Sequence, residues 1–565
     1  MLSLCATLAR TRLTAWALVL LVWACLYLPY LGAPELQGNE PKRVLPALQM
    51  LRSGDWLTPQ LGGIKYLNKP PLIYWSVAGA FALTGQTSEG VARLPSVLMV
   101  LLFVSLLVWQ PSRWLPLTAR LCAALLFLTI VSFVEKGRQI EIEAAFVSVT
   151  GIALLWWLNA WTASERGWSL WLGPCLMVAL GLLLKGPLIL LFFYVPVVCV
   201  AVAARRLRSV VAWQHGVAVV LMLLPLIAWV LAALAGNPDM NLARVWEGEM
   251  GSRYAVQSLD VAGWIGGIMK SFVDFMPWTL LLPIVWLPNA LQRMPESQRR
   301  FTKALRVAVV LCFVVISSMP GVRSRYYMPL FPLLCLLLAT TLEQWDSNAV
   351  IRLVWRRLVV IVSTIVAGIT LVASLLVPTG GLVALLQRLH ITLQLEVVRG
   401  LHAWRWPLIS VVLALGVCGG LYRARRRLVS AQDLAVASAL LVMTVGLGVI
   451  TYGVPCKRQF EDRRPAGAAL NAAISTNAVM YVYRVGYQPY YYYVARPITY
   501  LWKRAELTPA LHTIFTHTLF VPEITNQLAL TPVTCSRTPL PYRREPYVLL
   551  HLQPQPSVAP PLAAP

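Results

Sequence analysis

The sequence predicts an α-helical protein that crosses a membrane about thirteen times and carries a small α/β domain outside the membrane near its C-terminus. Only 13% of its 565 residues are charged and 58% are hydrophobic, whereas a soluble domain has about 25% charged residues. Apolar runs close to the ~20 residues that span a bilayer as a helix recur along the chain. Basic residues gather in every second loop between these runs, which is the pattern that orients a membrane protein.

Each apolar run is expected to form a helix, because backbone polar groups in lipid must be hydrogen-bonded within their own segment. The expected spans lie near residues 13–33, 92–109, 119–135, 143–161, 168–184, 187–204, 213–235, 277–292, 305–319, 327–342, 357–378, 404–422 and 433–453.

The charge of the loops predicts the orientation. Lys and Arg cluster in the loops that become cytoplasmic if the N-terminus is inside, so we expect a multi-pass protein of the cell inner (plasma) membrane with a cytoplasmic N-terminus. The long loops 34–91 and 236–276 are then extracytoplasmic. The net charge of +25 belongs to these basic loops. With no basic-aromatic module, nucleic acid is not an expected partner.

The chain divides into three predicted parts. Residues 1–453 form the transmembrane domain, 454–552 a periplasmic or extracytoplasmic α/β domain, and 553–565 a disordered tail rich in Pro and Ala. Within the α/β domain, Val479–Tyr483 and Tyr547–Leu552 have the composition of strands, and 466–473 that of a helix. Cys456 and Cys535 are the cysteines of this domain, and an oxidising compartment would allow them to pair; the sequence leaves that disulfide open.

The first outer loop carries the most informative polar pattern. Residues 41–51 have apolar side chains at helical spacing, which predicts an amphipathic helix at the membrane interface. Lys69 precedes a rigid Pro-Pro pair and lies near the expected membrane surface. The loop and the span after it read Gly38-Asn-Glu-Pro-Lys-Arg43, Gly54-Asp-Trp56, Lys65-Tyr-Leu-Asn-Lys-Pro-Pro-Leu-Ile-Tyr-Trp75 and Ala92-Arg-Leu-Pro-Ser96.

With these motifs in this order, the chain resembles the superfamily of GT-C type lipid-linked glycosyltransferases that contains the protein O-mannosyltransferases and the aminoarabinose (lipid A) transferases. The resemblance covers about residues 10–345. It implies an enzyme that moves a sugar from a polyprenyl-phosphate donor to lipid A, another envelope glycan or a protein, at the outer face of the inner membrane among membrane lipids. Further matches are Gly137-Arg-Gln-Ile-Glu-Ile-Glu143, Leu184-Lys-Gly-Pro187, Gly251-Ser-Arg-Tyr254 and Arg325-Tyr-Tyr-Met-Pro-Leu-Phe-Pro332.

Such a reaction needs cations for the departing phosphate and a carboxylate that accepts a proton from the acceptor hydroxyl. Position and resemblance make Lys69 the first candidate for the phosphate, although an interface lysine can also simply extend to the membrane surface. Further cations can equally anchor helix ends, and an acid at a helix start can simply cap that helix. The candidate set comprises the phosphate ligands Lys69, Arg253, Arg323 and Arg325, the acids Glu40 and Glu143 beside Asn39, and the neighbours Glu141, Lys185 and Tyr326.

Two residues depart from the superfamily pattern. Asn39 stands where many relatives have Asp, and an amide cannot act as a base. Asn68 stands where several have Glu, which removes a metal ligand. Either Glu40 or Glu143 is therefore the base, or the acceptor is an ionised group that needs none. No cofactor is expected on the sequence alone: the chain lacks Cys and His at metal-binding spacing, and a divalent metal is left open without support.

Two other functions fit a polytopic protein. A transporter or flippase would show internal repeats and charged or broken spans near the midplane. We find no convincing repeat, and the acidic residues gather at one membrane face. A non-catalytic scaffold stays open because of Asn39.

Overall fold

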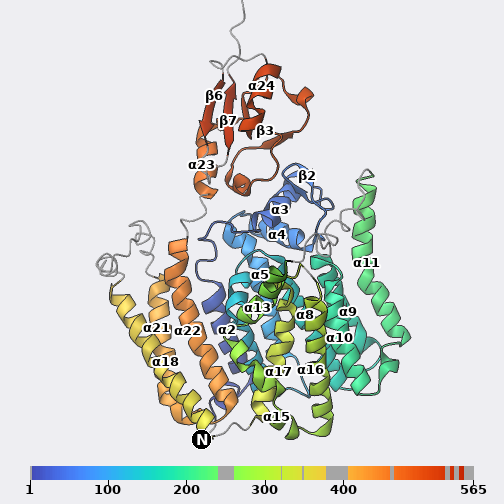
Figure 1. Ribbon diagram of the computed structural model, residues 1–565, viewed down its shortest axis with the longest axis vertical. Coiled ribbons are helices and arrows are strands. Elements are labelled where there is room, and N and C mark those ends of the chain that lie inside the picture. Colours follow the sequence, from blue (N-terminus) through green and yellow to red (C-terminus); the bar gives the residue numbers. More distant parts are fainter. Residues whose placement is uncertain are drawn as a thin grey trace, which may run out of the picture. The chain divides into compact units, whose positions relative to one another are not determined.

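The computed structural model describes residues 3–238, 260–319, 321–345, 349–376, 405–457, 463–508, 510–528, 535–539 and 546–552. The chain forms two compact units (Figure 1). The first unit comprises residues 1–34 and 67–458, and the second comprises residues 35–66 and 459–565. The predicted part 553–565 and the side chains of Cys456 and Cys535 lie outside the described residues.

The first unit is helical (Figure 1). Its helices are α1 (Leu4–Leu8), α2 (Arg12–Tyr27), α4 (Leu72–Thr84), α5 (Glu89–Trp109), α6 (Leu117–Leu128), α7 (Val131–Gly137), α8 (Ile142–Thr162), α9 (Trp168–Lys185), α10 (Leu188–Ala203), α11 (Trp213–Ala235), α13 (Val261–Asp274), α14 (Leu282–Trp286), α15 (Pro288–Gln292), α16 (Glu296–Ser317), α17 (Phe331–Gln344), α18 (Ala349–Leu376), α21 (Arg405–Ala424) and α22 (Ala431–Lys457).

These helices confirm the prediction of a polytopic α-helical membrane protein. Among the described residues, 7 helices are long and apolar enough to cross a membrane, or up to 9 if each of two bent helix pairs is one span. The total of thirteen stays a prediction. The predicted span 119–135 is broken in the structure, where α6 and α7 meet at 72°. Helix α13 lies in the predicted outer loop 236–276 and meets the segment Trp278–Trp286 at 88°. An additional apolar helix, α4, lies inside the predicted outer loop 34–91.

Helix α8 is enclosed by the rest of the first unit. Of its most apolar stretch, 89% is buried, against 22% for α11. Its neighbour α5 approaches closely, because Gly151 leaves room for the ring of Phe103: an added Cβ there would lie 2.7 Å from that ring. The buried position of α8 matters for function because polar residues at its N-terminal end are then held away from bulk solvent.

The second unit contains a five-stranded mixed sheet in the order β4-β3-β5-β7-β6. Strand β3 is parallel to both β4 and β5, while β7 runs antiparallel to β5 and β6. Helix α23 packs on one face through Ala466 and Leu470, and α24 covers the other through Val521 and Ile524. The bounds are β3 (Met480–Tyr483), β4 (Ile498–Leu501), β5 (Thr513–His517), β6 (Cys535–Pro539), β7 (Tyr547–Leu552), α23 (Arg463–Ala473) and α24 (Val521–Gln527).

Part of the first outer loop folds with this sheet. Helix α3 (Pro41–Ser53) forms where an amphipathic helix was predicted, and its Leu45 packs against the sheet's apolar core. Its place at the membrane interface stays a prediction. A short hairpin of β1 (Gln60–Leu61) and β2 (Ile64–Lys65) follows. The hairpin turn needs glycine at position 63, because Gly63 has φ +73° and an added Cβ would lie 2.5 Å from the ring of Tyr500.

Candidate active site

A group of charged residues surrounds the N-terminal end of α8. Glu141 is the residue before the helix and Glu143 lies in its first turn, where the helix dipole favours negative charge. Both are buried, with exposed fractions of 6% and 5%. Lys136, in the last turn of α7, places its Nζ 3.2 Å from Oε1 of Glu141. The bend between α6 and α7 therefore brings a cation to the start of α8.

Two more cations meet Glu143 from elements distant in the sequence. The Nζ of Lys185, the last residue of α9, lies 3.2 Å from Oε1 of Glu143, and the Nε of Arg325 lies 3.6 Å from the same oxygen. The ammonium of Lys185 also lies over two rings, 5.4 Å from the centre of Tyr326 and 5.3 Å from that of Phe146. The structure thus brings together Glu143, Lys185, Arg325 and Tyr326, which belong to three separate motifs of the sequence.

The two acids differ in their electrostatic surroundings. Glu143 faces two cations, which hold it in the ionised form. Burial raises the pKa of Glu141, and the negative charge of Glu143 raises that pKa further, while the Lys136 ion pair opposes both. Glu141 is therefore the more basic group.

Lys69 lies on a segment that is packed near the end of α9. Leu67 is buried in an apolar cluster with Leu183 and Trp229, and Leu183 is two residues before Lys185. Lys69, two residues after Leu67, is half-buried. The packing of Leu67 thus places the segment that carries Lys69 beside the C-terminal end of α9, which carries Lys185.

The short 3₁₀ helix Ser324–Tyr326, which carries Arg325, is held by α13. Gly267 of α13 passes so close that an added Cβ would lie 2.5 Å from the backbone oxygen of Val322. Trp264 donates a hydrogen bond from its indole N–H to the backbone oxygen of Ser317 at 2.8 Å. Of the other predicted cations, Arg323 is exposed and Arg253 lies outside the described residues.

Glu40 and Asn39 belong to the second unit. Glu40 is fully buried at the start of α3, where its Oε2 accepts a hydrogen bond from the backbone N–H of Gln37 at 2.6 Å. The backbone oxygen of Asn39 accepts from the N–H of Lys42 at 3.0 Å. These contacts give both residues a part in shaping the turn before α3.

Sequence reasoning missed two charged residues. Lys136 was not named, although a lysine five positions before Glu141, across a bend, could have been weighed as its partner. Glu35 was also missed: its carboxylate accepts hydrogen bonds at 3.0 Å from the backbone N–H groups of Arg463 and Arg464, which begin α23. Nothing in the sequence pairs residues so far apart.

Comparison with known proteins agrees with this architecture. The family model of the dolichyl-phosphate-mannose-protein mannosyltransferases matches residues 68–229. Over 95% of this chain and 97% of the other, the fold matches the crystal structure of ArnT from Cupriavidus metallidurans, also solved bound to undecaprenyl phosphate, with a TM-score of 0.64 and 17% identity. The fold is thus that of the ArnT structure, and residues 68–229 resemble the mannosyltransferase family.

Curated glycosyltransferases are similar to the chain in sequence. The chain is 28% identical over 337 residues to undecaprenyl phosphate-alpha-4-amino-4-deoxy-L-arabinose arabinosyl transferase 1 of Pseudomonas fluorescens, covering 59% of this chain and 60% of the relative. It is 29% identical over 349 residues to the corresponding Pseudomonas paraeruginosa enzyme, covering 60% of this chain and 62% of that one. The alignments thus span about three fifths of these relatives' length.

Proposed function

We propose that this protein is a glycosyltransferase that moves a sugar from a polyprenyl-phosphate donor to lipid A, another envelope glycan or a protein. The observation that carries the proposal is the buried cluster in which Lys185 and Arg325 meet Glu143. It lies at the end of α8 opposite the basic loops, which is the side where a lipid-linked sugar would be met in the proposed orientation. The names of the similar enzymes support the donor class.

The cations have distinct proposed roles. Lys69 binds the donor phosphate and stabilises the charge that grows on it as the glycosidic bond breaks. Arg253 and Arg323 are further phosphate ligands. Glu143 acts as a positioning residue, because its carboxylate orients Lys185 and Arg325. Among the described residues, no three His, Cys, Asp or Glu side chains lie close enough to hold a metal ion.

Glu141 is the proposed base, ahead of Glu143 and Glu40, because its pKa is raised by burial and by the charge of Glu143. Protonated Glu141 cannot accept a proton, so transfer should fall as the pH drops through a pKa above the usual ~4.3 of a glutamate. Glu141→Gln should slow transfer by about 100-fold and remove this acid limb from the pH–rate profile. Glu135→Gln, at an exposed site on α7, is the matched control. Unchanged rate and profile in Glu141→Gln would instead indicate an acceptor that is already ionised.

The proposed orientation follows the loop charges. The N-terminus is cytoplasmic, the sheet-containing C-terminal part is periplasmic, and the protein lies in the inner membrane. The parts proposed from the sequence are the transmembrane domain 1–453, the outer domain 454–552 and the tail 553–565.

Mass spectrometry of envelope lipids and glycans tests the function in cells. Cells that contain the protein should carry a sugar substituent that is missing from cells without it, and the substituted molecule identifies the acceptor. Identical envelopes together with solute counterflow in vesicles would favour a transporter and overturn the proposal.

A further inference from the structure

A cavity opens on the side of the first unit that carries the basic loops. Its volume is about 670 Å³. It is lined by the connection from α5 to α6, the C-terminal ends of α8 and α10, and the start of α16. This end of α8 is opposite to the end that holds Glu141 and Glu143. The cavity is therefore separate from the proposed active site.

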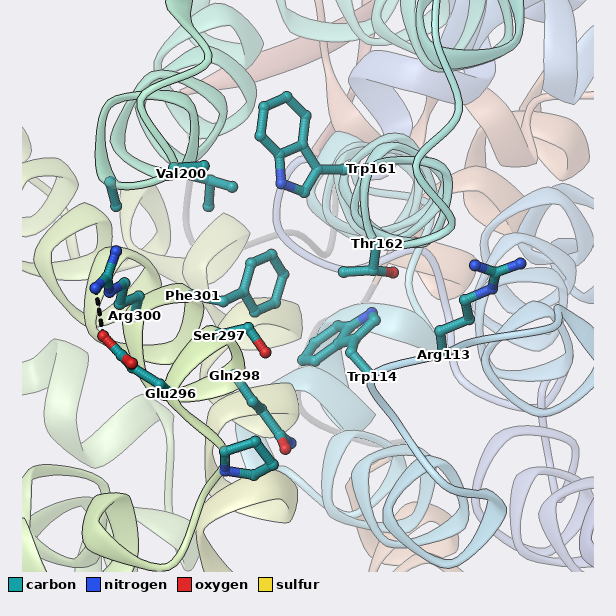
Figure 2. Close-up of a pocket in the computed structure, with 13 residues that line it drawn as sticks. Arg113, Trp114, Trp161, Thr162, Val200, Glu296, Ser297, Gln298, Arg300 and Phe301 are labelled. Carbon is teal, nitrogen blue, oxygen red and sulfur yellow. Dashed lines mark hydrogen bonds and ion pairs between the residues drawn. The ribbon is translucent and has the colours of Figure 1, made fainter.

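Positive charge surrounds this cavity. Arg113 and Arg300 lie on opposite sides of it, as Figure 2 shows. Arg206, from the loop after α10, stacks its guanidinium 4.7 Å from the ring centre of Trp161, which lines the cavity. The first turn of α16 also lines it, and the unpaired backbone N–H groups of a helix start attract anions. Glu296 is the one acid among the lining residues, and it is paired with Arg300.

The wall between the arginines is aromatic and apolar. Trp114, Trp161 and Phe301 are buried and line the cavity (Figure 2). Trp114 is fixed in place, because its indole N–H donates a hydrogen bond to Oδ1 of Asn159 at 3.2 Å and its ring meets Phe301 edge-on at 5.1 Å. Val200, near the end of α10, continues the apolar surface. The cavity thus joins an anion-attracting rim to an apolar wall.

We propose that this cavity binds the headgroup and upper acyl chain of an anionic phospholipid from the leaflet on the basic-loop side. Basic pockets between membrane helices on the cytoplasmic side recognise such headgroups. Tryptophan rings suit the interface depth at which phosphate and acyl chain meet. The arginines select for net negative charge, and the aromatic wall distinguishes a lipid from a free phosphate ion.

Native mass spectrometry of the full-length protein in detergent, titrated with phosphatidylglycerol, tests the proposal. Arg113→Gln/Arg300→Gln should weaken binding at least tenfold, because each basic side chain near an anionic surface contributes a factor of about five. Arg426→Gln/Arg427→Gln removes the same charge from an exposed basic loop outside the cavity and should leave binding unchanged. Glu296→Gln, which removes the acid, should tighten it.

Two competitors identify the ligand. Phosphatidylcholine should bind at least tenfold more weakly than phosphatidylglycerol, and inorganic phosphate in millimolar excess should not displace the lipid. The proposal is overturned if Arg113→Gln/Arg300→Gln binds like the unmodified protein, if both lipids bind equally, or if phosphate alone displaces the lipid. These readouts are independent of sugar transfer.

Discussion

Lys69→Ala is expected to lower the rate of sugar transfer by about 100- to 1,000-fold, which is the usual loss when one preorganised group that stabilises developing negative charge is removed. Lys69 lies on the segment that Leu67 anchors near the end of α9. Without its ammonium, the departing polyprenyl phosphate loses the cation assigned to it. The rate is measured as release of polyprenyl phosphate from a labelled donor by the purified protein.

Two controls accompany this variant. Lys65→Ala changes an exposed lysine four positions earlier in the same loop and should keep the full rate. Lys69→Arg retains the charge and should recover part of the loss. Full activity in Lys69→Ala, with a melting temperature equal to that of the unmodified protein, would remove Lys69 from the proposed site.

Glu143→Gln is expected to destabilise the protein and to lower transfer together. The substitution leaves Lys185 without the carboxylate 3.2 Å away, in a place where its side chain is only 11% exposed. Removing one partner of a buried ion pair lowers the free energy of unfolding by about 3–5 kcal/mol. Both cations that the carboxylate orients then lose their position, so the transfer rate falls as well. Thermal unfolding and the donor-release assay measure the two effects.

The double variant Glu143→Gln/Lys185→Met separates charge pairing from catalysis. Removing both charges should recover part of the lost stability, because the Lys185 ammonium is then no longer buried without its carboxylate, while transfer stays low. Glu165→Gln, at an exposed glutamate beyond the other end of α8, should change neither quantity. A Glu143→Gln protein with normal stability and a normal rate would contradict the positioning role.

Local patterns in the sequence predicted much of the fold. Apolar runs located the long helices, and the alternation in Tyr547–Leu552 located β7. Long-range contacts could not be predicted from local patterns. For example, the carboxylate of Glu35 accepts hydrogen bonds from the first backbone N–H groups of α23, and nothing near Arg463 in the sequence indicates this partner. The bend of 72° between α6 and α7 was also missed, because both helices are apolar and read as one run.

In the candidate site, the residues could be predicted from the sequence but their contacts could not. Glu141, Glu143, Lys185 and Arg325 were separate candidates in the sequence, because each lies in a motif that resembles the superfamily pattern. Their ion pairs depend on how α8, α9 and the 3₁₀ helix 324–326 pack, which residue types alone do not encode. The choice of Glu141 as the base rests on those contacts too, because burial and the neighbouring charge of Glu143 raise the pKa of Glu141.

Sugar transfer from a polyprenyl-phosphate donor can be observed in a reconstituted system. Purified protein in liposomes would be given a polyprenyl-phosphate donor with a labelled sugar together with envelope lipids. Polyprenyl phosphate should be released in step with the appearance of label on the acceptor, and Lys69→Ala should lower both by at least about 100-fold. Movement of labelled donor or solute across the bilayer without any cleavage of the sugar–phosphate bond would contradict it.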